Sequence, residues 1–186
     1  SSGLPWAVKH GHQTAAEMLL KEKADVEVRN NRDETPLFVA AEKGDWDVMK
    51  LLVEKGADVN EDSGDRTEGL QAVSNYTNAL QAASYNGHKA IVKLLLEKGA
   101  EVDVDCGFYS SALQMASHND HEAIVKVLLK KGAKLNAKGG HYGSALQAAS
   151  YNGHGAIVKL LLEKGAEVNA QDGYYGNALQ AASYNG

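Results

Sequence analysis

Residues 145–168 read ALQAASYNGHGAIVKLLLEKGAEV, and this stretch decides the fold because the chain contains it twice. Residues 79–102 repeat it with one change in 24 positions, where Lys89 stands in place of Gly155. So long a self-match within one chain indicates an internal repeat, which determines the class of fold before any local signal does.

Further copies of the stretch extend the repeat along the chain. They begin at Ala112 and at Pro36, and a more diverged copy covers residues 3–26. One column of the repeat always holds alanine: Ala24, Ala57, Ala100, Ala133 and Ala166. The steps between these alanines are 33, 43, 33 and 33 residues, so the period is 33 with ten additional residues once, between Asn60 and Asn78.

Each repeat carries the signals of two helices. The position before the first helix always holds a residue that caps helices well: Thr35, Asn78, Ser111, Ser144 or Asn177. In the quoted stretch this helix should end near Tyr151, because Asn152-Gly153 favours a turn. The second helix has its apolar residues at helical spacing: Ile157, Val158, Leu161 and Leu162. Glycines that favour its left-handed end follow in register: Gly56, Gly99, Gly132 and Gly165. Neither helix buries its apolar face alone, so we predict an all-α repeat solenoid of stacked units.

This pattern resembles the ankyrin repeat, x-T-P-L-H-x-A-A-x-x-G-H-x-x-[IV]-V-x-x-L-L-x-x-G-A-D-V-N. It is met at Thr35-Pro36-Leu37, at Gly56-Ala57-Asp58-Val59-Asn60, and from Gly153-His154 through Val168-Asn169. The chain departs from it where glutamine replaces the family histidine, at Gln81, Gln114, Gln147 and Gln180. The resemblance implies helix-turn-helix units with hairpin loops, stacked in a curved array. The wording NALQAASYNGH is similar to the self-similar ankyrin arrays of filamentous fungi, which often follow a nucleotide-binding or enzyme domain.

We therefore expect one ankyrin-repeat domain over residues 1–186. Its repeats should cover residues 1–33, 34–76 with the insertion, 77–109, 110–142 and 143–175, followed by a partial repeat over 176–186. Both ends read as cuts through a longer array. The insertion within residues 61–77 could form a partial extra helix or a mobile loop, and the loop is favoured because loops tolerate added length at low cost.

Composition excludes several classes of protein. Lysine and arginine number 19 against 24 aspartates and glutamates, a net charge of −5, which disfavours nucleic-acid binding. No run of 18 apolar residues exists, so no membrane span is expected. The single cysteine, Cys106, has no partner for an internal disulfide, and the N-terminus lacks the features of a signal peptide. We expect an intracellular protein, in the cytoplasm or the other reducing compartment, the nucleus.

The search for catalytic or metal-binding residues yields none. Four histidines share one column: His12, His88, His121 and His154. Units stack about 8–10 Å apart, too far for these side chains to share a zinc ion, so we interpret them as caps or bridges of the second helices. The polar run His118–Glu122 lacks His-Glu-x-x-His spacing, and neither a P-loop nor Gly-x-Ser-x-Gly is present. We expect no enzyme, no metal and no cofactor.

The tyrosines fall into two columns of the period. One lies in the hairpin loop before the first helix: Tyr76, Tyr109, Tyr142 and Tyr175. The other lies at the end of the first helix and contains Tyr85, Tyr151 and Tyr184, with His118 as its fourth member. Beside the hairpin column stand Phe108, His141 and Tyr174. The ankyrin resemblance implies that both places line the concave binding face, and tyrosine is enriched at binding surfaces. These eleven residues are the candidate partner-binding site.

Alternatives remain for individual positions. The hairpin tyrosines could equally pack hairpin on hairpin, whereas the helix-end column favours binding. Asn86, Asn119 and Asn152 are interpreted as turn residues. Trp6 is expected in the core and Trp46 on the surface. Asp120 takes the place of a turn glycine, which predicts backbone strain.

The function that the residues and the resemblance favour is a scaffold for protein-protein interaction, binding an unknown protein or peptide through the concave face. Two alternatives stand beside it. The array could be architectural and self-associate through its truncated ends, or it could be the targeting or sensing arm of a larger nucleotide-binding or enzymatic chain.

Overall fold

The structure is a computed structural model that describes residues 3–63, 77–104, 111–141 and 143–185. These residues form eleven α-helices, and the only β-type pairing among them is an isolated bridge between Gly139 and Gly143. The chain separates into two compact units, Ser1–Ala100 and Glu101–Gly186, each of which is a stack of helix pairs.

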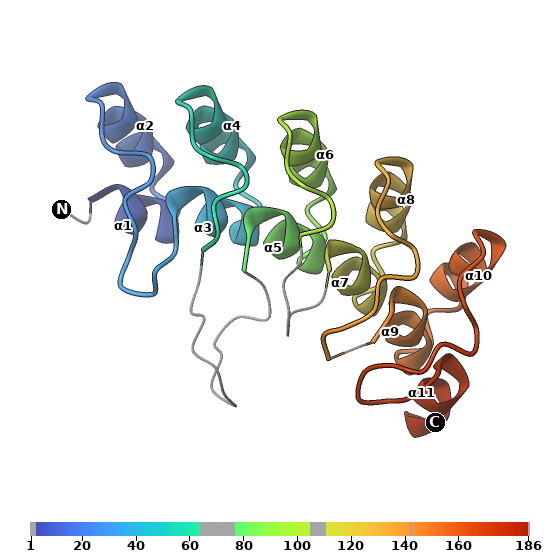
Figure 1. The fold of residues 1–186 in the computed structure, drawn as a ribbon. Coiled ribbons are helices and arrows are strands. Elements are labelled where there is room, and N and C mark those ends of the chain that lie inside the picture. Colours follow the sequence, from blue (N-terminus) through green and yellow to red (C-terminus); the bar gives the residue numbers. More distant parts are fainter. Residues whose placement is uncertain (1–2, 64–76, 105–110, 142, 186) are drawn as a thin grey trace. The chain divides into compact units, whose positions relative to one another are not determined.

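The first unit contains three helix pairs (Figure 1). They are α1 (Gly3–Lys9) with α2 (Gln13–Lys21), α3 (Pro36–Lys43) with α4 (Trp46–Glu54), and α5 (Ala79–Tyr85) with α6 (Lys89–Glu97). The first helices α1, α3 and α5 pack side by side in one layer, and the second helices α2, α4 and α6 form another. The unit is therefore a two-layer helical stack with loops projecting beyond the first helices.

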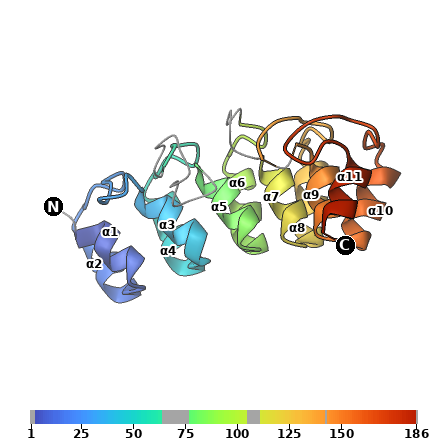
Figure 2. The same ribbon diagram turned by 90° about the horizontal axis from the view of Figure 1, so that it is seen from below.

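The second unit repeats this arrangement. Its helices are α7 (Ala112–His118), α8 (Glu122–Lys130), α9 (Ala145–Tyr151), α10 (Gly155–Glu163) and α11 (Ala178–Tyr184). Helix α9 packs between α7 and α11, while α8 and α10 cover the other side of α7 and α9 (Figure 2). The all-helical repeat fold predicted from the sequence is confirmed.

The helix boundaries follow the capping signals in the sequence. Each predicted N-cap side chain accepts a hydrogen bond from the backbone N–H three residues later: Thr35, Asn78, Ser111, Ser144 and Asn177. Pro36 occupies the first helical turn, where its missing N–H costs no intrahelical bond. The glycine column after the second helices is left-handed, with φ between 90° and 93° from Gly56 to Gly165. These signals are local, so they predicted the bounds well.

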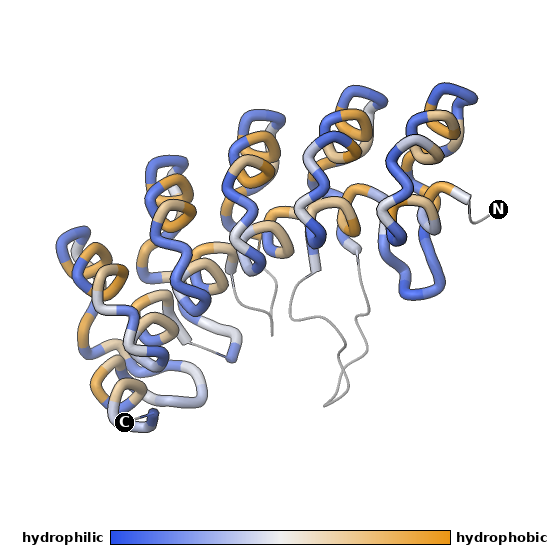
Figure 3. The backbone as a smooth tube through the Cα atoms, turned by 180° about the vertical axis from the view of Figure 1, so that it is seen from behind, coloured by the Kyte–Doolittle hydropathy of each residue, from blue (hydrophilic) through white to orange (hydrophobic). Residues whose placement is uncertain are grey.

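Small residues fill the space between first helices. In α9 the run from Ala145 to Ala149 is buried throughout, because neighbouring helices contact it on both sides. Larger apolar side chains come from both layers: Phe38 and Met115 of first helices are fully buried, as are Ile157 and Leu161 of a second helix. In Figure 3 the helices accordingly carry the hydrophobic colour and most turns between them the hydrophilic one.

The prediction for Trp6 is wrong. This side chain is 55% exposed and stacks on the rings of His10 and His12, at centroid distances of 4.4 and 5.0 Å. Leu4, Ala7 and Val8 supply the buried face of α1, and Trp6 lies off that face. Trp46 is 42% exposed, as predicted.

Two irregular features can be located. Asp120 has φ of 61°, so the predicted strain at this non-glycine turn residue is confirmed. The insertion leaves and re-enters the fold at neighbouring points, because the N–H of Ser63 donates to the carbonyl oxygen of Thr77 at 2.7 Å. Most of the insertion and Cys106 lie outside the described residues. No helix in the described part of the chain combines the length and apolar character that crossing a membrane requires.

Candidate interaction surface

Three tyrosines of the second unit lie in contact at the ends of α9 and α11. Tyr151 ends α9, Tyr184 ends α11, and Tyr175 belongs to the hairpin loop that precedes α11. The rings of Tyr151 and Tyr175 stack at a centroid distance of 4.2 Å with 24° between their planes. Tyr184 is tilted against both, at 6.1 Å from Tyr151 and 5.4 Å from Tyr175. The hairpin and helix-end columns thus meet in one cluster.

The hairpin loops extend this cluster with two more rings. His141 lies parallel to Tyr174 at 5.8 Å, and Tyr175 stands perpendicular to both, at 5.6 Å from His141 and 5.2 Å from Tyr174. The backbone N–H of Tyr174 donates to the carbonyl oxygen of His141 at 3.3 Å, which joins two successive hairpin loops. Edge-to-face rings at these distances stabilise one another, so the hairpin tyrosine takes part in packing as well as presenting surface.

Exposure distinguishes the members of the cluster. Tyr174 and Tyr184 are 72% and 67% exposed, whereas Tyr151 and Tyr175 are half-buried by their neighbours. We call the set His118, His141, Tyr151, Tyr174, Tyr175 and Tyr184 the aromatic surface. Large exposed aromatic side chains packed against half-buried ones form a surface that can bury considerable apolar area on a partner.

His118 occupies the helix-end column at the end of α7 and is tied into the fold. The amide nitrogen Nδ2 of Asn152 donates to Nδ1 of His118 at 2.7 Å and to its carbonyl oxygen at 3.1 Å. Burial, and then the charges of His154 and His141, lower the pKa of His118 from its ordinary value of 6.5. A neutral imidazole fits this site, because Nδ1 must keep its lone pair to accept from Asn152.

The asparagines beside the helix-end column close the ends of the first helices. Asn86 donates to the carbonyl oxygen of Ala82 at 2.9 Å, and Asn119 donates to that of Met115 at 3.0 Å. Asn185 reaches the preceding first helix, where it donates to the carbonyl oxygen of Tyr151 at 3.1 Å. These bonds give the asparagines the structural role that the sequence favoured.

The histidine column bridges successive helix pairs within each unit. In the first unit Nε2 of His88 donates to the carbonyl oxygen of Glu42 at 3.0 Å, at the end of α3. In the second unit Nε2 of His154 donates to the carbonyl oxygen of His118 at 2.8 Å, and its Nδ1 lies 3.7 Å from the carboxylate of Asp120. Of the two predicted roles, capping or bridging, both histidines bridge: each joins the start of a second helix to the end of the first helix of the preceding pair, and neither side chain caps its own helix.

The glutamine column has a role that the sequence analysis missed. Gln114 is buried in α7, and its Nε2 donates to the carbonyl oxygens of Gly143 at 2.8 Å and Gly139 at 3.2 Å, in the next hairpin loop. Gln147 likewise donates to the carbonyl oxygens of Asp172 and Gly176 in the hairpin loop that presents Tyr174 and Tyr175. Recurrence of glutamine at one buried column was the available signal.

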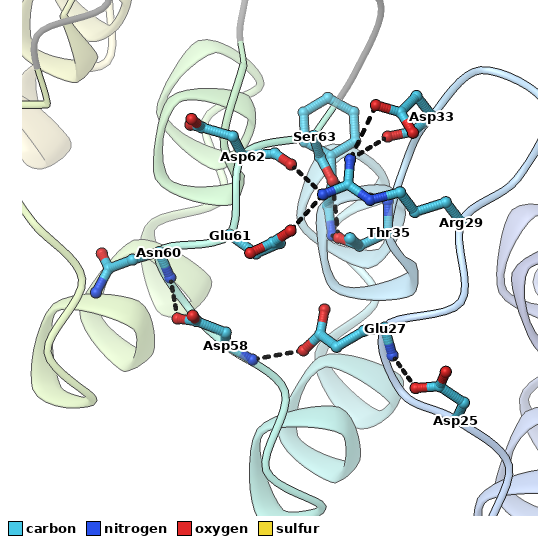
Figure 4. Close-up of polar contacts among 11 residues, drawn as sticks. Asp25, Glu27, Arg29, Asp33, Thr35, Asp58, Asn60, Glu61, Asp62 and Ser63 are labelled. Carbon is cyan, nitrogen blue, oxygen red and sulfur yellow. Dashed lines mark hydrogen bonds and ion pairs between the residues drawn. The ribbon is translucent and has the colours of Figure 1, made fainter.

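The first unit carries one helix-end tyrosine and a different polar arrangement. Tyr85 is half-buried at the end of α5. Arg29 joins two successive turns, since its guanidinium bonds the carboxylates of Asp33 and Glu61 and the carbonyl oxygen of Asp62 (Figure 4). These contacts hold the two turns against each other.

Four candidate residues, Tyr76, Phe108, Tyr109 and Tyr142, lie outside the described residues. Within the described ranges, no three histidine, cysteine, aspartate or glutamate side chains gather as a metal site would require.

Comparisons with known proteins agree with this architecture. A family model described as "Ankyrin repeats (3 copies)" matches residues 2–63, 64–139 and 80–172. The crystal structure of the human ASB11 ankyrin repeat domain is similar, with a TM-score of 0.82 and 26% identity, covering 98% of this chain and 77% of that one.

Three proteins are similar over shorter segments. A transient receptor potential cation channel subfamily A member 1 homolog of Caenorhabditis elegans is 36% identical over 78 residues, 42% of this chain. A probable E3 ubiquitin-protein ligase, XBOS32, of Oryza sativa subsp. japonica is 32% identical over 88 residues, 47% of this chain. A putative ankyrin repeat protein of Rickettsia bellii is 34% identical over 70 residues, 38% of this chain. The matches span 6%, 16% and 41% of those relatives.

Proposed function

Because this chain belongs to the ankyrin-repeat family, we propose that it is a non-catalytic module that binds a protein or peptide partner through its first-helix ends and hairpin loops. These elements form the concave face of ankyrin arrays. The observation that carries the proposal is the aromatic surface, in which Tyr174 and Tyr184 are mostly exposed while packed against half-buried rings. Held rings lose little conformational entropy on binding, which makes them effective contacts.

The test is affinity capture with the chain as bait, comparing two matched double variants. Tyr174→Ala with Tyr184→Ala removes two exposed rings from the aromatic surface, and Trp6→Ala with Trp46→Ala removes two exposed rings elsewhere. We expect the tyrosine variant to lose its captured protein at nearly unchanged thermal stability, and the tryptophan variant to retain it. Equal capture by both variants would refute the proposed face.

One observation favours self-association as a second candidate. Leu179 of α11 is 75% exposed, although its counterpart in α9, Leu146, is only 3% exposed under the next first helix. A second copy could cover Leu179 in the same way. Sedimentation at increasing protein concentration would show a dimer that Leu179→Ser abolishes, and a strict monomer rules this candidate out.

The relatives suggest a wider context for the module. Two of them are named as a channel homologue and a probable ubiquitin ligase, and the chain matches only 6% and 16% of their lengths. We propose that the repeats serve as a targeting or sensing arm where they belong to a longer chain.

A further inference from the structure

We infer that the aromatic surface binds an uncharged, proline-rich segment of its partner in the extended polyproline conformation. This inference rests on the proposed function and names the chemistry of the partner. Three properties of the described residues carry it: the lack of charged residues in the first helices, the presence of unbonded hydroxyl donors, and the exposure of ring faces.

Charge is segregated away from the aromatic surface. The first helices of the second unit, α7, α9 and α11, read ALQMASH, ALQAASY and ALQAASY, without a single Asp, Glu, Lys or Arg. The nearby acidic side chains have internal partners, since Asp172 accepts from the N–H of Gly139 at 2.6 Å and Asp120 lies against His154. Most lysines of this unit lie on the second helices and in the turns after them, and Lys138, in the hairpin loop of His141, pairs with Glu167 at 3.9 Å. The first helices therefore bring no charged residue to the aromatic surface, which favours an uncharged ligand over an acidic or basic one.

Hydrogen-bonding capacity distinguishes among uncharged ligands. The hydroxyls of Tyr151, Tyr174 and Tyr184 form no hydrogen bond with the described residues of the chain, so they can donate to a ligand. A polyproline helix has no internal hydrogen bonds, and its carbonyl oxygens all point outward as acceptors. An amphipathic helix already satisfies its own carbonyl groups and makes little use of such donors. A β-strand ligand needs a sheet edge, which the described part of this unit does not have.

Ring geometry fits the same ligand. Proline side chains pack flat on aromatic faces, and aromatic-lined grooves are the usual receptors of polyproline segments. Tyr174 stands perpendicular to Tyr175, while Tyr184 is tilted against Tyr151 and Tyr175, so exposed rings at different angles face the solvent. A polyproline segment is already ordered before binding and pays little conformational entropy, which suits a shallow surface of this kind.

The experiment measures fluorescence anisotropy of labelled peptides with the whole chain. The probe is decaproline with blocked ends, and its controls are a Gly-Ser peptide of equal length and a leucine-faced helical peptide of zero net charge. We expect saturable binding of decaproline, weaker binding of both controls, and a loss of about tenfold or more in affinity for Tyr174→Ala with Tyr184→Ala. Trp46→Ala should bind decaproline as the unchanged chain does.

A second pair of variants separates rings from hydroxyls. Tyr174→Phe with Tyr184→Phe keeps both rings and should lower the affinity for decaproline by about fivefold, because two hydroxyl donors are lost. Absence of saturable decaproline binding overturns the inference, as does binding that survives the alanine variants. If the helical peptide binds more tightly and depends on the same tyrosines, the partner class is wrong while the proposed function stands. If the alanine variants also capture cellular protein as well as the unchanged chain does, the proposed function fails too.

Discussion

Replacing Gln114 by alanine should break the hydrogen bonds that hold the hairpin loop of Gly139 and Gly143 against helix α7. In the structure, Nε2 of Gln114 donates to the carbonyl oxygens of Gly143 and Gly139, and Oε1 accepts from the N–H of Ser111 at 2.6 Å. The side chain is only 3% exposed. Alanine removes all of these bonds at once, so the backbone groups of the loop and of Ser111 lose their glutamine hydrogen-bond partner.

The expected cost follows from the bonds. Each contributes about 1 kcal/mol net, and a buried group left unsatisfied costs about 1–3 kcal/mol, so the free energy of unfolding should fall by about 2–4 kcal/mol. The chain contains a matched control in Gln180, which occupies the same column in α11. Gln180 is exposed, and its Oε1 accepts from the N–H of Asn177 at 2.9 Å. Gln180→Ala removes only this capping-box bond, so it should lower the free energy of unfolding by no more than about 1 kcal/mol.

Urea unfolding and amide hydrogen exchange together measure the effect. Repeat arrays do not always unfold in a single step, so exchange protection at Gly139 and Gly143 identifies where stability is lost. Gln114→Glu provides a second check, because a carboxylate facing carbonyl oxygens should destabilise at neutral pH and recover partly as acid protonates it. If Gln114→Ala and Gln180→Ala cost the same to within about 0.5 kcal/mol, the fastening role of this column is refuted.

Three further predictions concern particular residues. Because folding lowers the pKa of His118 below 6.5, the unfolded chain binds a proton at this residue more readily than the folded chain does. The contribution of His118 to the free energy of unfolding is therefore complete above pH 6.5 and declines as the pH falls below 6.5. The decline levels off once the pH is below the pKa of His118 in the folded chain. His118→Tyr should remove this decline from urea midpoints measured across the range, and an unchanged profile would contradict it. Gly143 has φ of 78°, and a Cβ added there would lie 2.7 Å from the carbonyl oxygen of Asp172. Gly143→Ala should therefore lower the melting temperature more than Gly153→Ala, where an added Cβ meets no atom within 4 Å and the substitution should cost about 1 kcal/mol. Equal shifts in melting temperature would show that the loop around Gly143 moves aside without cost. Arg29→Met should lower the free energy of unfolding by about 1–2 kcal/mol and make it less sensitive to salt. Arg32→Met, which removes a more exposed guanidinium at 4.0 Å from Glu34, should lower it by less than about 0.5 kcal/mol in the same urea experiment.

The sequence predicted the features that depend on neighbouring residues. The period, the N-caps from Thr35 to Asn177 and the left-handed glycines are local signals repeated several times, so chance agreement was small. A bridging role for His154 was also among the predictions, since its column recurs once per 33-residue repeat. Each of these signals is weak in one copy, and its recurrence in several copies made it reliable.

Features that depend on the path of a loop were not predicted. The sequence places the two tyrosine columns at neighbouring positions of the repeat, but it does not show that the hairpin loop brings Tyr175 into contact with both Tyr151 and Tyr184. Gln147 reaches a loop 25 and 29 residues further along the chain, a distance that no local pattern encodes. Trp6 was assigned to the core because it lies inside the first helix of a repeat, whereas the smaller residues around it already fill the buried face of α1.

Many bonds between successive helix pairs end on the main chain. His88 donates to a carbonyl oxygen of the preceding helix pair, Gln114 donates to carbonyl oxygens of the next loop, and Asn136 accepts from the N–H of Glu167. Main-chain atoms are the same in every copy, whatever side chains have mutated around them. A duplicated or deleted copy therefore finds ready partners on either side, so such a gene can change its number of repeats in one recombination event without redesigning an interface. The near-identity of residues 79–102 and 145–168 is the trace that such an event would leave.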